Sequence, residues 1–123
     1  MPLQNVPTLD EPLMRGDNEE IAFTITQPNS STPQNISGWT LRFSAKFDLS
    51  DSAALITKTS ATPGHFIIDD AAAGEGRIII DKTDWPAAIS YETTLICDLE
   101  CTDAAGKRFT RRFKAPIELD VTT

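Results

Sequence analysis

The sequence is poor in the residues that most often build catalytic and metal sites. Its 123 residues include one histidine and two cysteines. The histidine, His65, has no second histidine to complete a zinc site and no nucleophile for which it would be the evident base. No serine lies in a Gly-x-Ser-x-Gly elbow. We therefore expect a protein that is not an enzyme and that needs neither a metal nor a cofactor.

The two cysteines do not fit the pattern of a disulfide framework. Cys97 and Cys101 are four residues apart in a segment that reads as a strand, so they share a face with their Cα atoms about 13 Å apart. A disulfide needs Cα atoms within about 7 Å. We expect two small buried apolar side chains, as in a protein of a reducing cytoplasm rather than in a disulfide-rich secreted domain.

Long apolar runs and excess positive charge are also missing. Eleven basic residues stand against 18 acidic ones, which gives a net charge of −7 and predicts no nucleic acid partner. The sequence has no apolar stretch of bilayer length, and its start lacks the regions of a signal peptide. We expect a soluble chain, made without cleavage and without a membrane partner. Arg15-Gly16-Asp17 spells an integrin-recognition tripeptide, but a protein without a secretory signal has little route to integrins. We therefore expect the tripeptide to have a structural role.

What the sequence does contain is alternation with a period of two, which is typical of strands. It predicts one all-β domain, an antiparallel two-layer sandwich, for which we favour an immunoglobulin-like topology, with a jelly roll as the second possibility and the strand order open. One helical turn, capped by Thr83 or Asp84, is expected within residues 82–89. About eight strands are expected, at residues 21–25, 41–47, 55–59, 65–69, 77–81, 91–101, 107–113 and 115–121, with a hairpin joining 65–69 to 77–81.

The first 14 residues are expected to form an extended arm, followed by the sandwich at 15–123. Pro2, Pro7 and Pro12 remove amide donors and hold the backbone near polyproline geometry, in which the arm would reach roughly 40 Å. We favour an arm that docks on a partner over a frayed terminus. Its apolar anchors would be Val6, Leu9, Leu13 and Met14.

Positive charge is concentrated in one predicted strand. Five of the eleven basic residues lie between Lys107 and Lys114. The alternation that turns Phe109 and Phe113 inward also turns Arg111 inward, which is costly unless an acid pairs with it or it lies at the rim of the sandwich. Arg108, Arg112 and Lys114 then project outward together, either as a docking surface or as cations that protect an edge strand from aggregation.

The order of these signals resembles the N-terminal module of phage baseplate upper proteins and related small phage virion proteins. The resemblance covers residues 15–121. It rests on Arg15-Gly16-Asp17 before the strand at 21–25, Ile36-Ser37-Gly38-Trp39 before the strand at 40–47, the glycine turn and isoleucine strand at 74–80, Thr83-Asp84 leading to Tyr91, and an Ala-Gly turn before Phe109-Thr110 and the closing strand.

The resemblance implies a virion structural protein with an immunoglobulin-like sandwich, made in the host cytoplasm and present in the particle as a homo-oligomer bound to other virion proteins. It would join receptor-binding fibres to the tail or baseplate. Because no coiled coil follows Thr123, a capsid decoration protein, bound to the major capsid protein, is the second role. A carbohydrate-binding module is the alternative of another class, with Trp39, Trp85 and Tyr91 as candidates. It needs Trp85 and Tyr91 exposed together.

Overall fold

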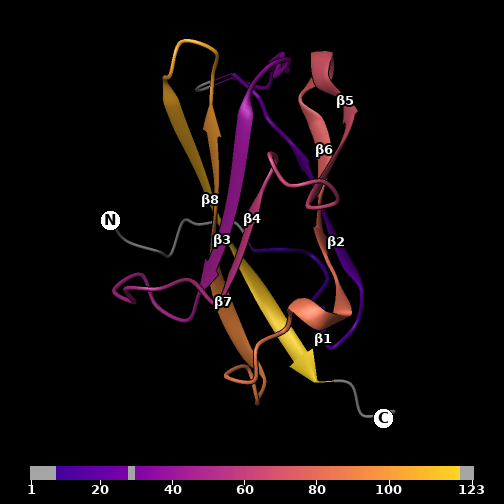
Figure 1. Ribbon diagram of the computed structural model, residues 1–123, viewed down its shortest axis with the longest axis vertical. Helices are drawn as coiled ribbons and strands as arrows, with labels where there is room; N and C mark the ends of the chain where they lie inside the picture. Colours follow the sequence, from indigo (N-terminus) through magenta and orange to yellow (C-terminus); the bar gives the residue numbers. More distant parts are fainter. Residues whose placement is uncertain (1–7, 28–29, 120–123) are drawn as a thin grey trace.

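Two β-sheets packed face to face make up the computed structural model, which describes residues 8–27 and 30–119 (Figure 1). The five-stranded sheet has the order β1-β8-β7-β3-β4 and the three-stranded sheet has the order β2-β6-β5. The prediction of an all-β two-layer sandwich is confirmed. The strands are β1 (Leu13–Arg15), β2 (Glu19–Thr24), β3 (Thr40–Lys46), β4 (Ile56–Thr59), β5 (Phe66–Asp70), β6 (Glu75–Ile80), β7 (Thr93–Thr102) and β8 (Arg108–Leu119).

The core lies between the two sheets and is built by the alternation that the sequence displays. Phe43 of β3 is 1% exposed and pairs with Leu99 of β7, which is 2% exposed. From the three-stranded sheet, Ile78 and Ile80 of β6 are buried against them. Every second side chain of these strands is therefore removed from water, which is the main favourable term in folding.

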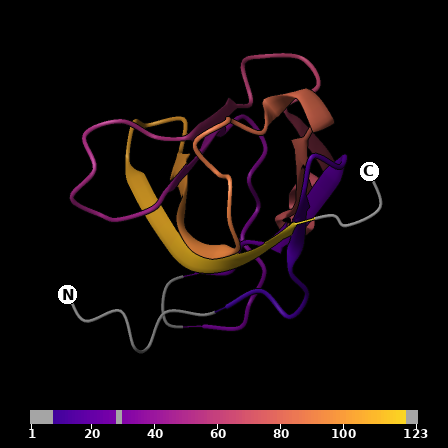
Figure 2. The same ribbon diagram turned by 90° about the horizontal axis from the view of Figure 1, so that it is seen from below.

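The last strand differs from the prediction. Residues 107–113 and 115–121 were expected to form two strands, but Arg108–Leu119 is one continuous strand that curves along the five-stranded layer (Figure 2). The alternation keeps its phase from Phe113 through Ala115 to Ile117, so no turn is needed. Pairing with β7 runs without a shift from Thr102↔Arg108 to Thr93↔Ile117.

The connections around β6 agree with the prediction in outline. The hairpin of β5 and β6 is confirmed, and a 3-10 turn, η1 (Ala71–Ala73), joins its strands. Gly74 follows with φ +71°, and a Cβ there would lie 2.5 Å from the Ile25 carbonyl oxygen. Only glycine fits this left-handed position, because any side chain would meet the backbone of Ile25 and Gln34.

The expected helical turn forms at η2 (Lys82–Asp84), but its predicted cap is wrong. The N-cap is Asp81, whose carboxylate accepts from the Thr83 N–H at 3.0 Å. Asp84 is the third residue of the turn and accepts in return from the Asp81 N–H at 2.7 Å. This reciprocal arrangement is a capping box, which satisfies donors at the start of the turn.

Both cysteines are free and buried on the inner face of β7, as expected. Burial raises the pKa of Cys97 to about 12 and that of Cys101 to about 11. Their thiols are therefore protonated and unreactive near neutral pH. In residues 8–27 and 30–119, no helix has the length and apolar character needed to cross a bilayer.

Candidate functional site

The N-terminal segment lies along β8. The Leu9 N–H donates to the Lys114 carbonyl at 2.9 Å, and Thr8 forms a parallel bridge with the same residue. β1 continues this course as a parallel neighbour of β8, in the register Leu13↔Ile117 to Arg15↔Leu119. The predicted boundary between arm and sandwich, after residue 14, falls inside β1. From Thr8 onward the segment belongs to the edge of the five-stranded sheet.

The predicted apolar anchors of the arm have different positions. Val6 lies outside the described residues. Leu13 is 7% exposed and belongs to the core, and Leu9 is half-buried against that core. Met14 is half-buried, and its N–H donates to Glu19 Oε2 at 2.6 Å. In this conformation Leu9 and Leu13 hold the segment to its own sandwich.

The Arg-Gly-Asp tripeptide is hydrogen-bonded to the loop between η2 and β7. The Arg15 guanidinium donates to the carbonyl oxygens of Ile89 and Pro86. The Asp17 carbonyl accepts from the Trp85 indole N–H at 2.8 Å. These bonds support the structural interpretation of the tripeptide, because its arginine is not displayed as a free side chain.

The basic strand presents its outward cations beside acids of β7. Arg112 makes two bonds to the Asp98 carboxylate, of 2.7 and 3.0 Å, and the hydrogen bond to Asp98 raises the pKa of Arg112. Arg108 lies 3.4 Å from Glu100. Lys114 is half-buried directly opposite Ile96. The structure thus brings the arm and the three predicted cations together along one strand.

Two further cations join this surface from β3. Arg42 lies opposite Glu100, and Lys46 lies opposite Ile96. We call this surface the outer face: on it, residues of β3, β7 and β8 and of the loop after β3 border a hollow of about 370 Å³. The outer face consists of Arg42, Ser44, Lys46, Leu49, Ile96, Asp98, Glu100, Arg108, Arg112 and Lys114.

The outer face reverses the sign of the molecule. It carries five cations and two carboxylates, whereas the whole chain carries −7, so the remainder carries −10. The sequence identified the part on β8 only. Arg42 and Lys46 alternate with buried residues along β3, but alternation does not reveal that β3 lies beside β7, two strands from the basic cluster.

The inward position predicted for Arg111 fits the structure, and the residue lies at the rim of the sandwich. Its guanidinium donates to the Thr26 carbonyl at 3.2 Å, and the side chain is half-buried. Beside it, Trp39 stacks on Phe109 with ring centroids 5.7 Å apart. A backbone carbonyl therefore takes the place of the acid that a fully buried arginine would need.

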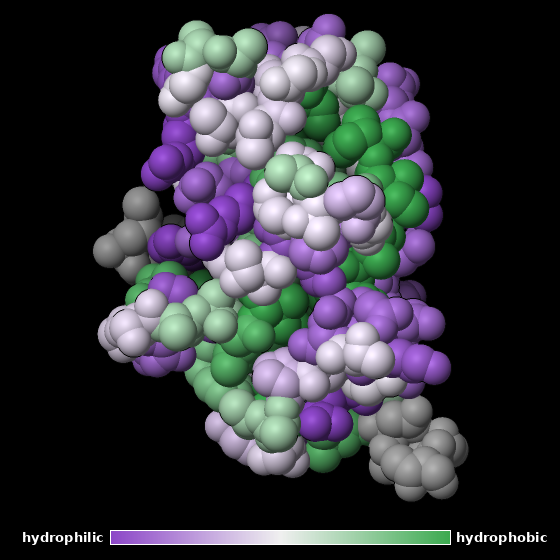
Figure 3. Space-filling view, viewed as in Figure 1, coloured by the Kyte–Doolittle hydropathy of each residue, from purple (hydrophilic) through white to green (hydrophobic). Residues whose placement is uncertain are grey.

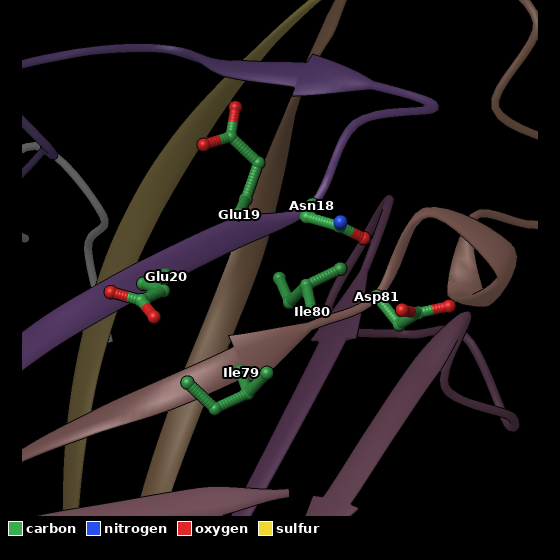
Figure 4. Close-up of a pocket in the computed structure, with 6 residues that line it drawn as sticks. All are labelled: Asn18, Glu19, Glu20, Ile79, Ile80 and Asp81. Carbon is green, nitrogen blue, oxygen red and sulfur yellow. The ribbon is translucent and has the colours of Figure 1, made fainter. Parts of the chain in front are cut away.

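A second hollow, of about 600 Å³, lies where β2 and β6 meet the preceding and following loops (Figure 4). Its three carboxylates already have partners. Glu19 accepts from the Met14 N–H, Glu20 pairs with Arg77 at 3.1 Å, and Asp81 caps η2. Within the described ranges, no three His, Cys, Asp or Glu side chains are grouped to hold a metal ion. These carboxylates serve the fold.

The aromatic residues do not form the platform that a sugar site would need. Trp85 is 8% exposed, with its indole bound to Asp17, whereas Tyr91 is 57% exposed and stacks on Phe47 with centroids 6.1 Å apart. The condition that both be exposed together is not met.

Comparison with protein-family models and with curated proteins found no match to this chain. The function is therefore inferred from the geometry of the outer face and from the resemblance to small phage virion proteins.

Proposed function

We propose that this chain is a non-catalytic structural protein of a phage particle, which docks on another virion protein through the outer face and the adjoining N-terminal segment. The observation that carries the proposal is the convergence at β8. The strand bears three of the five cations of the outer face, and its opposite edge receives the segment from Thr8 to Arg15. Two features far apart in the sequence thus form one continuous surface.

The partner would present an acidic surface. Charges at an interface steer association and fix its register, and they act over about 8 Å at physiological ionic strength. Several groups of the outer face are half-buried in the sheet, so contact requires little ordering of long side chains. The virion context comes from the resemblance, with the tail or baseplate as the first location and the capsid as the second.

The strand order supports an immunoglobulin-like topology over a jelly roll. In order of hydrogen-bonded neighbours, β2, β6 and β5 form one sheet, while β8, β7, β3 and β4 lie in the other. Variable-type immunoglobulin domains divide their B, E and D strands from G, F, C and C′ in the same way. Such sandwiches present a broad outer sheet surface, which suits docking between rigid parts of a particle.

The proposal is tested by binding of the purified chain to purified phage tails and purified capsids. We expect Lys114→Glu to weaken binding about tenfold at low salt and less at high salt, because it reverses a charge of the outer face. Lys82→Glu is the control, since Lys82 is an exposed lysine of η2, which follows β6 of the other sheet. Equal binding by the two variants would contradict the role of the outer face.

A truncation tests the N-terminal segment. Deleting residues 1–7 spares β1, whereas deleting residues 1–14 would remove Leu13 from the core and is not a clean experiment. We expect the shorter deletion to leave the domain folded and to reduce incorporation into particles. Normal incorporation would show that residues 1–7 take no part in docking, and would confine the proposed contact to the outer face and to the segment from Thr8 to Arg15. If the intact chain binds neither tails nor capsids, the virion role fails and a glycan array becomes the next measurement.

A further inference from the structure

The edge of the three-stranded sheet exposes apolar side chains. Ile67 and Ile68 of β5 are 39% and 43% exposed, although both belong to a strand. β5 pairs with β6 on one side, and no other described strand pairs with it. In Figure 3, hydrophobic atoms are visible at the upper right of the molecule, where Figure 1 draws this hairpin. Such an open apolar edge is a template for pairing with another strand.

The backbone of β5 also has unpaired groups along this edge. The Ile79 N–H donates to the His65 carbonyl at 2.9 Å, so positions 65 and 67 direct their polar groups toward β6. The Ile67 carbonyl accordingly lies beside Gly76. Phe66 and Ile68 must then direct their N–H and C=O groups away from the sheet. In the described ranges no other segment bonds to these four groups.

We propose that β5 pairs antiparallel with β5 of a second copy of this chain, about a two-fold axis at Ile67. Phe66 of each copy would lie opposite Ile68 of the other, and these pairs would exchange four backbone hydrogen bonds. Ile67 would lie opposite Ile67 of the second copy. The two three-stranded sheets would become one six-stranded sheet, and the exposed isoleucines would be buried at the junction.

The alternation of β5 selects this register. Phe66 packs inward against the core, and Ile67 points outward. A shift of one residue would set inward side chains against outward ones and place the two cores on opposite sides of the joined sheet. A shift of two would lose a Phe66–Ile68 pair or reach the register shift between Ile68 and Asp70.

The charges favour a second copy in the antiparallel direction. β5 ends in Asp69 and Asp70, which an in-register parallel pairing would stack against their equivalents. The antiparallel pairing separates the two acidic ends and sets Asp69 opposite His65 of the second copy. The contact deepens the proposed function, since it names the interface between copies in the particle. It uses none of the residues of the outer face.

The decisive experiment is sedimentation velocity over a range of protein concentrations. We expect the intact chain to dimerise as its concentration rises, and Ile67→Lys and Ile67→Glu each to remain monomeric. Because position 67 faces itself across the axis, an equal mixture of the two variants should form dimers again. The matched control is Thr24→Lys, Thr24→Glu and their mixture, at an exposed position of β2 on the far edge of the same sheet. Those proteins should behave as the intact chain does.

A cross-link tests the register. The two Cβ atoms at position 67 would lie about 4.5–5.5 Å apart, so Ile67→Cys should form a disulfide-linked dimer on mild oxidation, whereas Thr24→Cys should not. Cys97 and Cys101 stay out of the reaction because they are buried. An intact chain that stays monomeric at every concentration would overturn the proposal, as would charged variants that dimerise singly or fail to recombine. Particle binding by the Lys114→Glu variant is measured separately, so the two proposals can fail independently.

Discussion

The two sheets differ in how far their edge strands are protected from pairing with another strand. In the five-stranded sheet, one edge strand, β1, comes from the N-terminal segment and covers β8. The other, β4, turns Lys58 inward to an ion pair with Asp84, and an inward charge discourages further pairing. The three-stranded sheet ends in β5 with two exposed isoleucines. The chain therefore protects the edges of the larger sheet itself and leaves an edge of the smaller one for a partner.

Residues at the edges of the two sheets differ in role: some are buried and stabilise the fold, whereas others are exposed and can contact a partner. Leu13 and Lys58 lie at edges of the larger sheet, and both are buried. Ile67 lies at the edge of the smaller sheet and is exposed. Substitutions at the first two positions should therefore change folding stability, whereas substitutions at the third should change association.

The largest effect is expected for Leu13→Ala. Removing a buried leucine side chain leaves a cavity and costs about 3 kcal/mol of unfolding free energy. Ile67→Ala removes a similar number of atoms from an exposed edge and should cost less than about 1 kcal/mol. Urea denaturation monitored by tryptophan fluorescence gives both values. Equal losses of unfolding free energy would show that both edges contribute alike to folding stability, and would contradict the difference proposed between them.

The ion pair at β4 is the next largest. Asp84→Asn should cost about 2 kcal/mol, because it leaves the buried Lys58 without a charged partner, and it costs less than in a fully buried pair because Asp84 is 29% exposed. Lys58→Met should be close to neutral, since Asp84 is more exposed and keeps the Asp81 N–H as a donor. If Lys58→Met lowered the unfolding free energy more than Asp84→Asn does, the ion pair would be a net contributor to folding stability, and not only a charge that discourages further pairing at β4.

The same pair predicts a pH dependence. Burial alone would raise the pKa of Asp84, but the hydrogen bonds from Lys58 and the Asp81 N–H outweigh it and hold that pKa below its ordinary value. A lowered pKa in the folded state contributes stability above the unfolded value of about 3.9 and loses it as the pH falls through the folded value. Unfolding free energy should therefore fall less steeply below pH 4 in Asp84→Asn than in the intact chain.

Much of the fold follows from the sequence, because alternation identifies strands and their buried faces. Cys97 and Cys101 were expected to be buried, and Arg111 was placed inward at a cost that a rim position relieves. β1 was missed. Its three residues are too few to show a period, and they follow Pro12 in a segment whose spacing suggests an arm. Only the parallel pairing with β8, about 100 residues away in sequence, makes them a strand.

The candidate surface was predictable in part for the same reason. Arg108, Arg112 and Lys114 form a local cluster that the sequence displays. Their neighbours across the sheet cannot be read from the sequence in this way, since the position of Arg42 opposite Glu100 depends on β3 lying beside β7. Strand order depends on packing between distant segments, and a pattern with a period of two is the same whichever strand lies alongside.

The smallest effect on folding is expected on the outer face, for the pair of Arg112 and Asp98. Both side chains are about 30% exposed, at 31% and 28%, and a double-mutant cycle with alanine at each position should give a coupling of about 0.5–1 kcal/mol that shrinks in 1 M salt. Arg112→Ala should nevertheless reduce particle binding as strongly as Lys114→Glu does, because the guanidinium is then lost to the partner. A coupling above about 2 kcal/mol would place the pair with Lys58 and Asp84 among the contacts that hold the sandwich together. Its charges would then be committed to the fold, and the outer face would have only Arg42, Lys46, Arg108 and Lys114 to offer an acidic partner.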